Sequence, residues 1–140
     1  MSGLKLEDLS IGQTAERSQT VTEATIAAFA EVSGDHNPVH LDADFAATTS
    51  FKERIAHGML SAAYISAVLG NDLPGPGAIY LSQTLNFRRP VKIGDVVTAR
   101  VTVAAIDADK ARVTFNTVCE VSGKPVVTGE AVIMAPRRDA

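Results

Sequence analysis

The chain contains no tryptophan and a single cysteine, Cys119. A single thiol forms no internal disulfide and lacks the paired spacing of a structural zinc site, so the sequence excludes both kinds of cross-link. Aromatic residues make up 5% of the 140 residues, whereas hydrophobic residues make up 46%, enough for a substantial core. A chain of this size favours one domain that buries roughly 70% of its unfolded surface.

The chain also has no excess of basic charge and no long apolar run. The formal net charge of −3 argues against a dedicated nucleic-acid-binding protein, which carries a basic patch and a high pI. No apolar run approaches the roughly 18 residues that cross a bilayer. The first residues show no apolar core followed by a small-residue cleavage site, so no export signal is visible. We therefore expect a cytoplasmic protein that binds neither nucleic acid nor membrane.

The second half of the chain alternates apolar and polar residues with a period of two, which predicts β-strands. Three successive segments, residues 97–103, 113–121 and 127–133, show this alternation clearly. The connections at residues 107–110 and 122–125 are short, so these strands are expected to be consecutive and antiparallel. Residues 80–87 predict an earlier strand, and residues 13–21 are a weaker candidate.

Residues 58–69 have no polar face beyond Ser61 and Ser66, which is typical of a helix buried on all sides. The apolar face of the predicted sheet needs a cover, and this helix is the obvious one. The sequence thus predicts an α+β domain in which an antiparallel sheet curls around one central helix. Thr22 predicts the start of an earlier helix that ends at Gly34, and Asp42 predicts a short helical turn. The apolar face of the earlier helix is expected to contain Ile26, Phe29, Ala30 and Val32.

Residues 33–42 carry the strongest functional signal, because Asp35 precedes His40 by five positions across an Asn37-Pro38 step. Proline fixes its own φ and pushes Asn37 into an extended conformation, so we expect a stiff, non-helical linker. A carboxylate and an imidazole held in this way can converge on one water and transfer protons at neutral pH. The same residue types are common turn formers, so an Asx turn at Asp35 and a surface position for His40 are the alternatives.

His57 and Gly58 stand at the start of the predicted central helix, where the first N–H groups lack an internal partner. Glycine lets a ligand oxygen approach these donors, as in an oxyanion hole, or it simply permits a tight turn. We expect His57 to cap the helix or to pack. Ser66 follows Gly58 by about two turns, so its hydroxyl either faces the same site or bonds to a carbonyl of the preceding turn.

Basic side chains cluster at two places near these segments. Each cluster could contact a phosphorylated ligand or be ordinary solvated surface charge. The residues are Lys52, Arg54, Arg88, Arg89 and Lys92.

Two runs of the sequence resemble the MaoC-like family. Residues 29–40 are similar to its hydratase motif, Asp-x-Asn-Pro-x-His, with Asp35, Asn37, Pro38 and His40 at the defining positions. Residues 55–60 resemble the start of its central helix, and the similarity continues from residues 86–95 to residues 129–132. The chain most resembles the short (R)-specific enoyl-CoA hydratases that supply polyhydroxyalkanoate synthesis.

This resemblance implies a hot-dog fold over residues 1–135. Residues 136–140 have the composition of a frayed C-terminal tail. The resemblance implies a homodimer that reversibly hydrates a trans-2-enoyl-CoA to an (R)-3-hydroxyacyl-CoA. It also implies roles for individual residues: Asp35 and His40 as the catalytic pair, the Gly58 N–H as donor to the thioester oxygen, Ser66 as a further site residue, and Asn37 as support for the loop. No metal or other cofactor is implied, and coenzyme A enters only as part of the acyl-CoA thioester substrate.

Two other functions remain open at this point. A hot-dog acyl-CoA thioesterase would direct water at the carbonyl carbon and release a free thiol from a saturated acyl-CoA. A non-catalytic acyl-CoA-binding subunit would bind the thioester without turnover.

Overall fold

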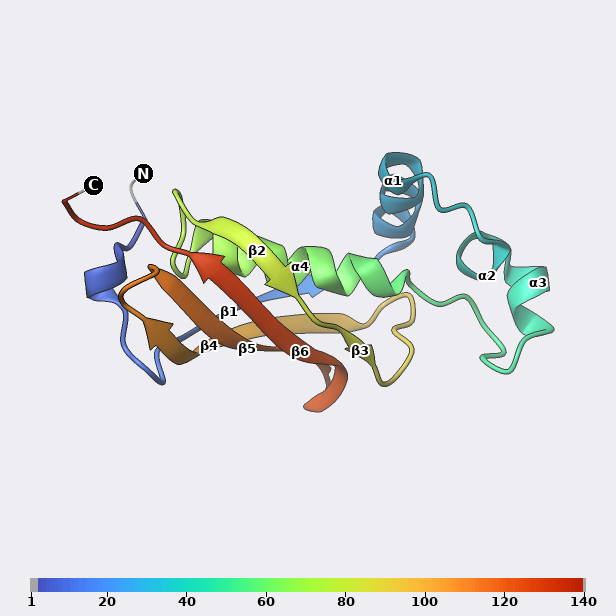
Figure 1. Ribbon diagram of the computed structural model, residues 1–140. Coiled ribbons are helices and arrows are strands. Elements are labelled where there is room, and N and C mark those ends of the chain that lie inside the picture. The colour runs from blue at the N-terminus through green and yellow to red at the C-terminus, as the bar shows by residue number, and fades with distance from the viewer. Residues whose placement is uncertain (1–2, 140) are drawn as a thin grey trace.

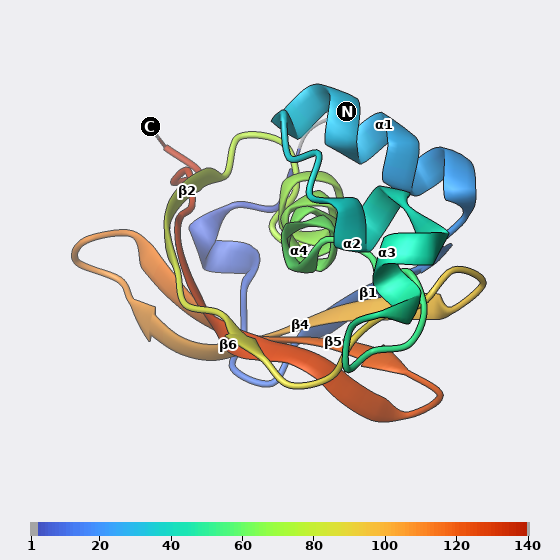
Figure 2. The same ribbon diagram turned by 90° about the vertical axis from the view of Figure 1, so that its right-hand side faces the viewer.

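The computed structural model describes residues 3–139 and consists of one antiparallel sheet wrapped around a long helix, α4 (Figure 1). The sheet order is β1-β4-β5-β6-β2, and β3 also pairs with β6. Figure 2, which looks along α4, shows the sheet curving beneath and beside this helix. In chain order the elements are η1 (Leu6–Asp8), β1 (Thr14–Thr20), α1 (Glu23–Ser33), α2 (Pro38–Leu41), α3 (Ala43–Ala47), α4 (Gly58–Asn71), β2 (Ile79–Gln83), β3 (Asn86–Phe87), β4 (Val96–Asp107), β5 (Arg112–Val121) and β6 (Lys124–Met134).

The strands predicted from the period-two alternation are confirmed by their pairing and burial. Val97, Ala99, Val101 and Val103 of β4 are all buried, and β4, β5 and β6 pair consecutively and antiparallel. The segment predicted as one strand at residues 80–87 is instead divided into β2 and β3. Both pair with β6, and between them the carbonyl of Thr84 lies so close to Gly129 that a β-carbon there would be 1.9 Å from it.

The central helix is confirmed, but its burial on all sides is wrong for the single chain. One face packs into the core through Leu60, Ile65, Val68 and Leu69. The opposite face is exposed and includes Met59, Ala63, Ser66 and Gly70. Because the helix is rich in small apolar residues on every side, its composition did not distinguish the two faces. Within residues 3–139, no helix is both long and apolar enough to span a bilayer.

Helix α1 begins and ends at the predicted caps, and α3 begins after the predicted Asp42. The Thr22 hydroxyl accepts a hydrogen bond from the Thr25 N–H at 3.1 Å, and Gly34 ends α1 with φ 79°. Ile26 is fully buried, whereas Val32 is 87% exposed, so its expected place on the apolar face was wrong. A face built on Ile26 recurs three, four and seven residues later, and Val32 falls outside that series.

The expectation of a non-helical linker before His40 was also partly wrong. Asn37 is extended as expected (φ −54°, ψ 125°), but Pro38 begins the single helical turn α2, which contains His40. Proline suits a first helical position because the missing N–H would have no helical partner there. The side-chain oxygen of Asn37 accepts a hydrogen bond from the Val39 N–H at 3.1 Å and so caps this turn.

The C-terminal segment is attached to the N-terminal one over its described residues. Leu6 donates to the Pro136 carbonyl at 2.9 Å, and Arg138 donates its backbone N–H to Glu7 at 2.8 Å and forms an ion pair with Asp8. These contacts contradict a frayed end over residues 136–139. Ala140, the last residue of the predicted tail, lies outside the described residues.

Candidate active site

His40 is buried rather than at the surface, which excludes the alternative of an exposed loop histidine. The residue is only 8% exposed, and its Nδ1 lies 2.8 Å from the carbonyl oxygen of Ile55. A carbonyl only accepts, so Nδ1 carries the hydrogen and Nε2 keeps its lone pair. Burial lowers the pKa of His40; the hydrogen bond to Ile55 raises it, nearby His57 lowers it and Asp35 raises it. The ring is therefore a neutral imidazole with a free acceptor near neutral pH.

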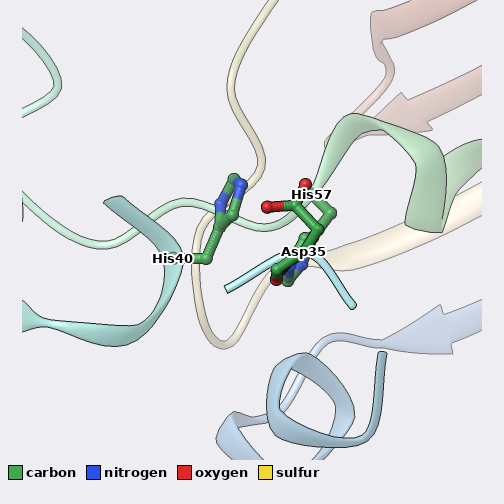
Figure 3. Close-up of side chains that lie close together, drawn as sticks. All are labelled: Asp35, His40 and His57. Atoms are coloured by element: carbon green, nitrogen blue, oxygen red, sulfur yellow. Dashed lines mark hydrogen bonds between the residues drawn. The ribbon is translucent and has the colours of Figure 1, made fainter. Parts of the chain in front are cut away.

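Asp35 lies in the exposed loop between α1 and α2 and forms the Asx turn that the sequence allowed as an alternative. Its Oδ1 accepts a hydrogen bond from the Asn37 N–H at 3.1 Å, and its own N–H donates to the Ser33 hydroxyl at 3.1 Å. The turn does not prevent a second role. One carboxylate oxygen of Asp35, one ring nitrogen of His40 and one of His57 all lie within 4.8 Å of one another (Figure 3).

His57 joins this pair from the residue before α4, a position that the sequence did not connect with Asp35 or His40. Its Nε2 lies 3.0 Å from the backbone oxygen of Asp35. Its ring stacks on His40 with centroids 3.9 Å apart and an angle of 29° between the planes. The expectation that His57 packs is confirmed. Because 22 residues separate it from Asp35, no local spacing in the sequence indicates the contact.

Backbone and arginine contacts fix α2 against the rest of the chain. The Arg54 Nε donates to the carbonyl of His40 at 2.8 Å, while its Nη1 binds Glu23 of α1 at 2.7 Å. The Ile55 N–H donates to the carbonyl of Val39 at 3.3 Å. The turn that carries His40 is thus held at both its backbone and its side chain.

A cavity of about 470 Å³ opens beside His40, at the N-terminal end of α4. Gly58, the first residue of α4, lines it, and a β-carbon at this position would lie 2.6 Å from the ring of Phe87. Glycine is therefore the residue that leaves room at the helix start, where N–H groups favour a negatively charged ligand atom. Arg88 and Arg89 also line the cavity.

Ser66 is not brought to this cavity. It lines a second cavity of about 520 Å³ on the exposed face of α4, beside β2. Met59 borders both cavities. Asn37 borders neither, and its contacts are those that hold the Asp35 loop and begin α2.

The cluster of Asp35, His40 and His57 contains the residue types that bind metals, but its geometry suits proton transfer better. A metal ion needs nitrogen lone pairs that converge on one point. The lone pairs of two stacked rings lie in nearly parallel planes, and one nitrogen of each ring already faces a backbone carbonyl. We therefore interpret the cluster as an acid–base group.

An antiparallel sheet wrapped around one long helix defines the hot-dog class of folds, and in this chain ionisable side chains also gather at the N-terminus of that helix. Within that class, the chain belongs to the MaoC-like family, whose domain model, described as MaoC like domain, matches residues 8–129. The sequence resemblance is thereby confirmed.

Similar proteins span nearly the whole chain. An (R)-specific enoyl-CoA hydratase from Rhodospirillum rubrum is 56% identical over 132 residues, covering 94% of this chain and 92% of that protein. The unliganded structure of R-hydratase PhaJ1 from Pseudomonas aeruginosa has a TM-score of 0.92 at 52% identity, covering 97% of this chain and 88% of its own. The (R)-hydratase from A. caviae, described as involved in PHA biosynthesis, has a TM-score of 0.90 at 49% identity, covering 93% and 99%.

Proposed function

We propose that the protein is an (R)-specific enoyl-CoA hydratase, which reversibly adds water to a trans-2-enoyl-CoA and yields an (R)-3-hydroxyacyl-CoA. The observation that carries this proposal is the placement of the Asp35 carboxylate near a ring nitrogen of His40, which itself lines the first cavity together with Gly58. The names of the similar hydratases support the same reaction.

The two side chains divide the work on one water molecule. His40 Nε2, which holds a free lone pair, accepts a proton from the water, while the Asp35 carboxylate accepts the other O–H and orients the oxygen. The oxygen forms a bond to C3, and the electron pair of the C2–C3 double bond moves toward the thioester carbonyl. The imidazolium of His40 then returns its proton to C2. The proton added at C2 and the hydroxyl added at C3 come from one water on one face of the double bond, which gives syn addition.

Gly58 stabilises the charge that develops on the thioester oxygen. As the first residue of α4, its N–H has no partner within the helix and can donate to that oxygen. A backbone donor of this kind is typically worth roughly 10²–10³-fold in rate. The thioester itself makes the C2 proton acidic, so the reaction proposed here uses no metal or redox cofactor.

The remaining residues are assigned by the cavities that they line. Arg88 and Arg89 line the first cavity, and we assign them to the phosphates of coenzyme A. Ser66 is assigned to the acyl end of the site, reached past Met59, which borders both cavities. Asn37 supports the catalytic loop through its two hydrogen bonds.

A homodimer is part of the proposal. The exposed face of α4 adjoins the edge strand β2, where Ile79, Tyr80 and Leu81 are 54%, 40% and 42% exposed. Contiguous apolar surface of this kind is typical of a protein–protein interface.

A cytoplasmic location is proposed as well, since CoA thioesters are metabolised there and Cys119 is an unpaired thiol. Supply of (R)-3-hydroxyacyl-CoA to polyester synthesis is the role proposed for the product.

The test is hydration of crotonyl-CoA by the purified protein, followed by chiral analysis of the product. We expect (R)-3-hydroxybutyryl-CoA, with turnover lowered roughly 10²–10⁴-fold in Asp35→Asn and in His40→Gln. Thiol release from butyryl-CoA without hydration would instead identify a thioesterase. Binding of crotonyl-CoA with neither hydration nor thiol release would identify a non-catalytic subunit.

A further inference from the structure

His57 contacts both members of the proposed catalytic pair and also lines the first cavity. It occupies the position just before α4, where serine, threonine or aspartate commonly caps a helix. Within the described chain its side chain makes no such cap bond. It is 2% exposed and lies between the ring of Phe29, at a centroid distance of 4.9 Å, and the ring of His40. The side chain is thus committed to the loop and to α2 rather than to the helix start.

The two nitrogens of His57 have different surroundings. Nε2 lies 3.0 Å from the carbonyl oxygen of Asp35 and therefore carries the hydrogen that it donates. Nδ1 is buried and has no hydrogen-bond partner within residues 3–139. Burying an unpaired polar atom is unfavourable, and a phenyl ring would fill the same space without it. The requirement that explains histidine here is the combination of a flat ring and a donor at Nε2.

We propose that His57 is a positioning residue that sets the geometry of Asp35 and His40 through two separable contacts. The Nε2–H group holds the backbone of Asp35, and the ring covers one face of the His40 imidazole, which fixes its plane and shields that face from water. This inference rests on the proposed function, because it assigns the pair to hydration.

The ring contact has its own signature in the titration of His40. The charged or ionisable groups near that ring are Asp35 in the loop, His57 before α4, Arg54 on its backbone carbonyl, and Arg88 and Arg89 across the cavity. Burial is the main cause that lowers the pKa of His40, and His57 adds to it. Replacing the His57 ring by a smaller chain admits water, so the pKa of His40 should rise toward its ordinary value.

Two substitutions separate the contacts. His57→Gln places an amide N–H near the position of Nε2 and removes the ring, whereas His57→Phe keeps a ring and removes the donor. The control is His36→Gln, which removes the same ring from an exposed position one residue after Asp35. Thermal unfolding of all three variants confirms that each one folds.

We expect His57→Phe to lower kcat for crotonyl-CoA roughly 10- to 100-fold with KM changed less than about 3-fold, because the Asp35 loop loses its tether. His57→Gln should keep kcat within about 5-fold of the parent, since its amide restores the donor. NMR titration of the His40 ring should show a higher midpoint in His57→Gln and little change in His57→Phe. His36→Gln should match the parent in all three measurements.

Equal losses of kcat in both His57 variants, with an unchanged His40 titration, would overturn the inference and leave His57 as a space-filling residue. The inference is also overturned if both His57 variants hydrate crotonyl-CoA with the kcat of the parent protein. If the parent does not hydrate crotonyl-CoA but the NMR midpoints shift as stated, the proposed function fails while the coupling between His57 and His40 is supported.

Discussion

The first residue of α4 offers a test that separates catalysis from stability, because Gly58→Ala adds one methyl group beside the proposed oxyanion donor. The new β-carbon would lie 2.6 Å and 2.7 Å from two carbons of the Phe87 ring. Carbon atoms pack at about 3.5–4.0 Å, so the ring or the helix start must move by roughly 1 Å. Phe87 is 56% exposed, so its ring can move toward solvent.

The expected energies follow from this geometry. Alanine is favoured over glycine in a helix by up to ~1 kcal/mol, which offsets the displaced ring and leaves the free energy of unfolding within ~1 kcal/mol of the parent. Catalysis should suffer far more, because the methyl and the displaced ring crowd the approach of the thioester oxygen to the Gly58 N–H. Loss of one oxyanion donor typically costs roughly 10²–10³-fold, and we expect kcat/KM for crotonyl-CoA to fall by that factor.

Gly70→Ala is the matched control, since it makes the same substitution in the same helix. Within the described structure nothing lies within 4 Å of a β-carbon at Gly70. It should change the free energy of unfolding by no more than ~1 kcal/mol and leave turnover unchanged, because Gly70 lines neither cavity. Urea unfolding and initial-rate kinetics on both variants decide the matter. A Gly58→Ala enzyme with the kcat/KM of the parent would refute the role given to this helix start.

Three further predictions concern stability and reactivity. Burial holds the pKa of folded His40 below its ordinary value of 6.5, so the folded protein binds fewer protons than the unfolded chain in mild acid. This contribution to stability is present above pH 6.5 and lost as pH falls through the lowered pKa; urea unfolding between pH 7.5 and 5 should show the loss, and it should shrink in His40→Gln. Burial raises the pKa of Cys119 to about 12, so a disulfide reagent such as DTNB at pH 8 should label it only after unfolding. Gly129→Ala would place a β-carbon 1.9 Å from the Thr84 carbonyl and should lower the free energy of unfolding by roughly 1–3 kcal/mol in a urea titration, whereas an unchanged midpoint would contradict the close approach.

The sheet and its central helix were predictable because their signals are local. Alternation with a period of two assigns the faces of β4, β5 and β6, and short turns make them antiparallel neighbours. The exposed face of α4 was not predictable, since Ala63 and Ser66 fit either a core or an interface. The sequence gives no sign of which surface remains uncovered in one chain.

The candidate site shows the same division between local and distant contacts. Asp35 and His40 could be paired from the sequence because a proline elbow separates them by only five positions. Their contact with His57 depends on where α1 and α2 fold back over the start of α4, and no spacing encodes that. Ser66 was expected near Gly58 from helical periodicity alone, but Met59 lies at the border between their cavities.

The central claim is that the carboxylate and the imidazole act together on one water. A double-mutant cycle in crotonyl-CoA hydration tests it most directly, with Asp35→Asn, His40→Gln and the combined variant compared with the parent. If the two groups form one unit, the combined variant should be no slower than the slower single variant. Losses that multiply, so that the combined variant is slower by the product of the two factors, would show that the groups act independently.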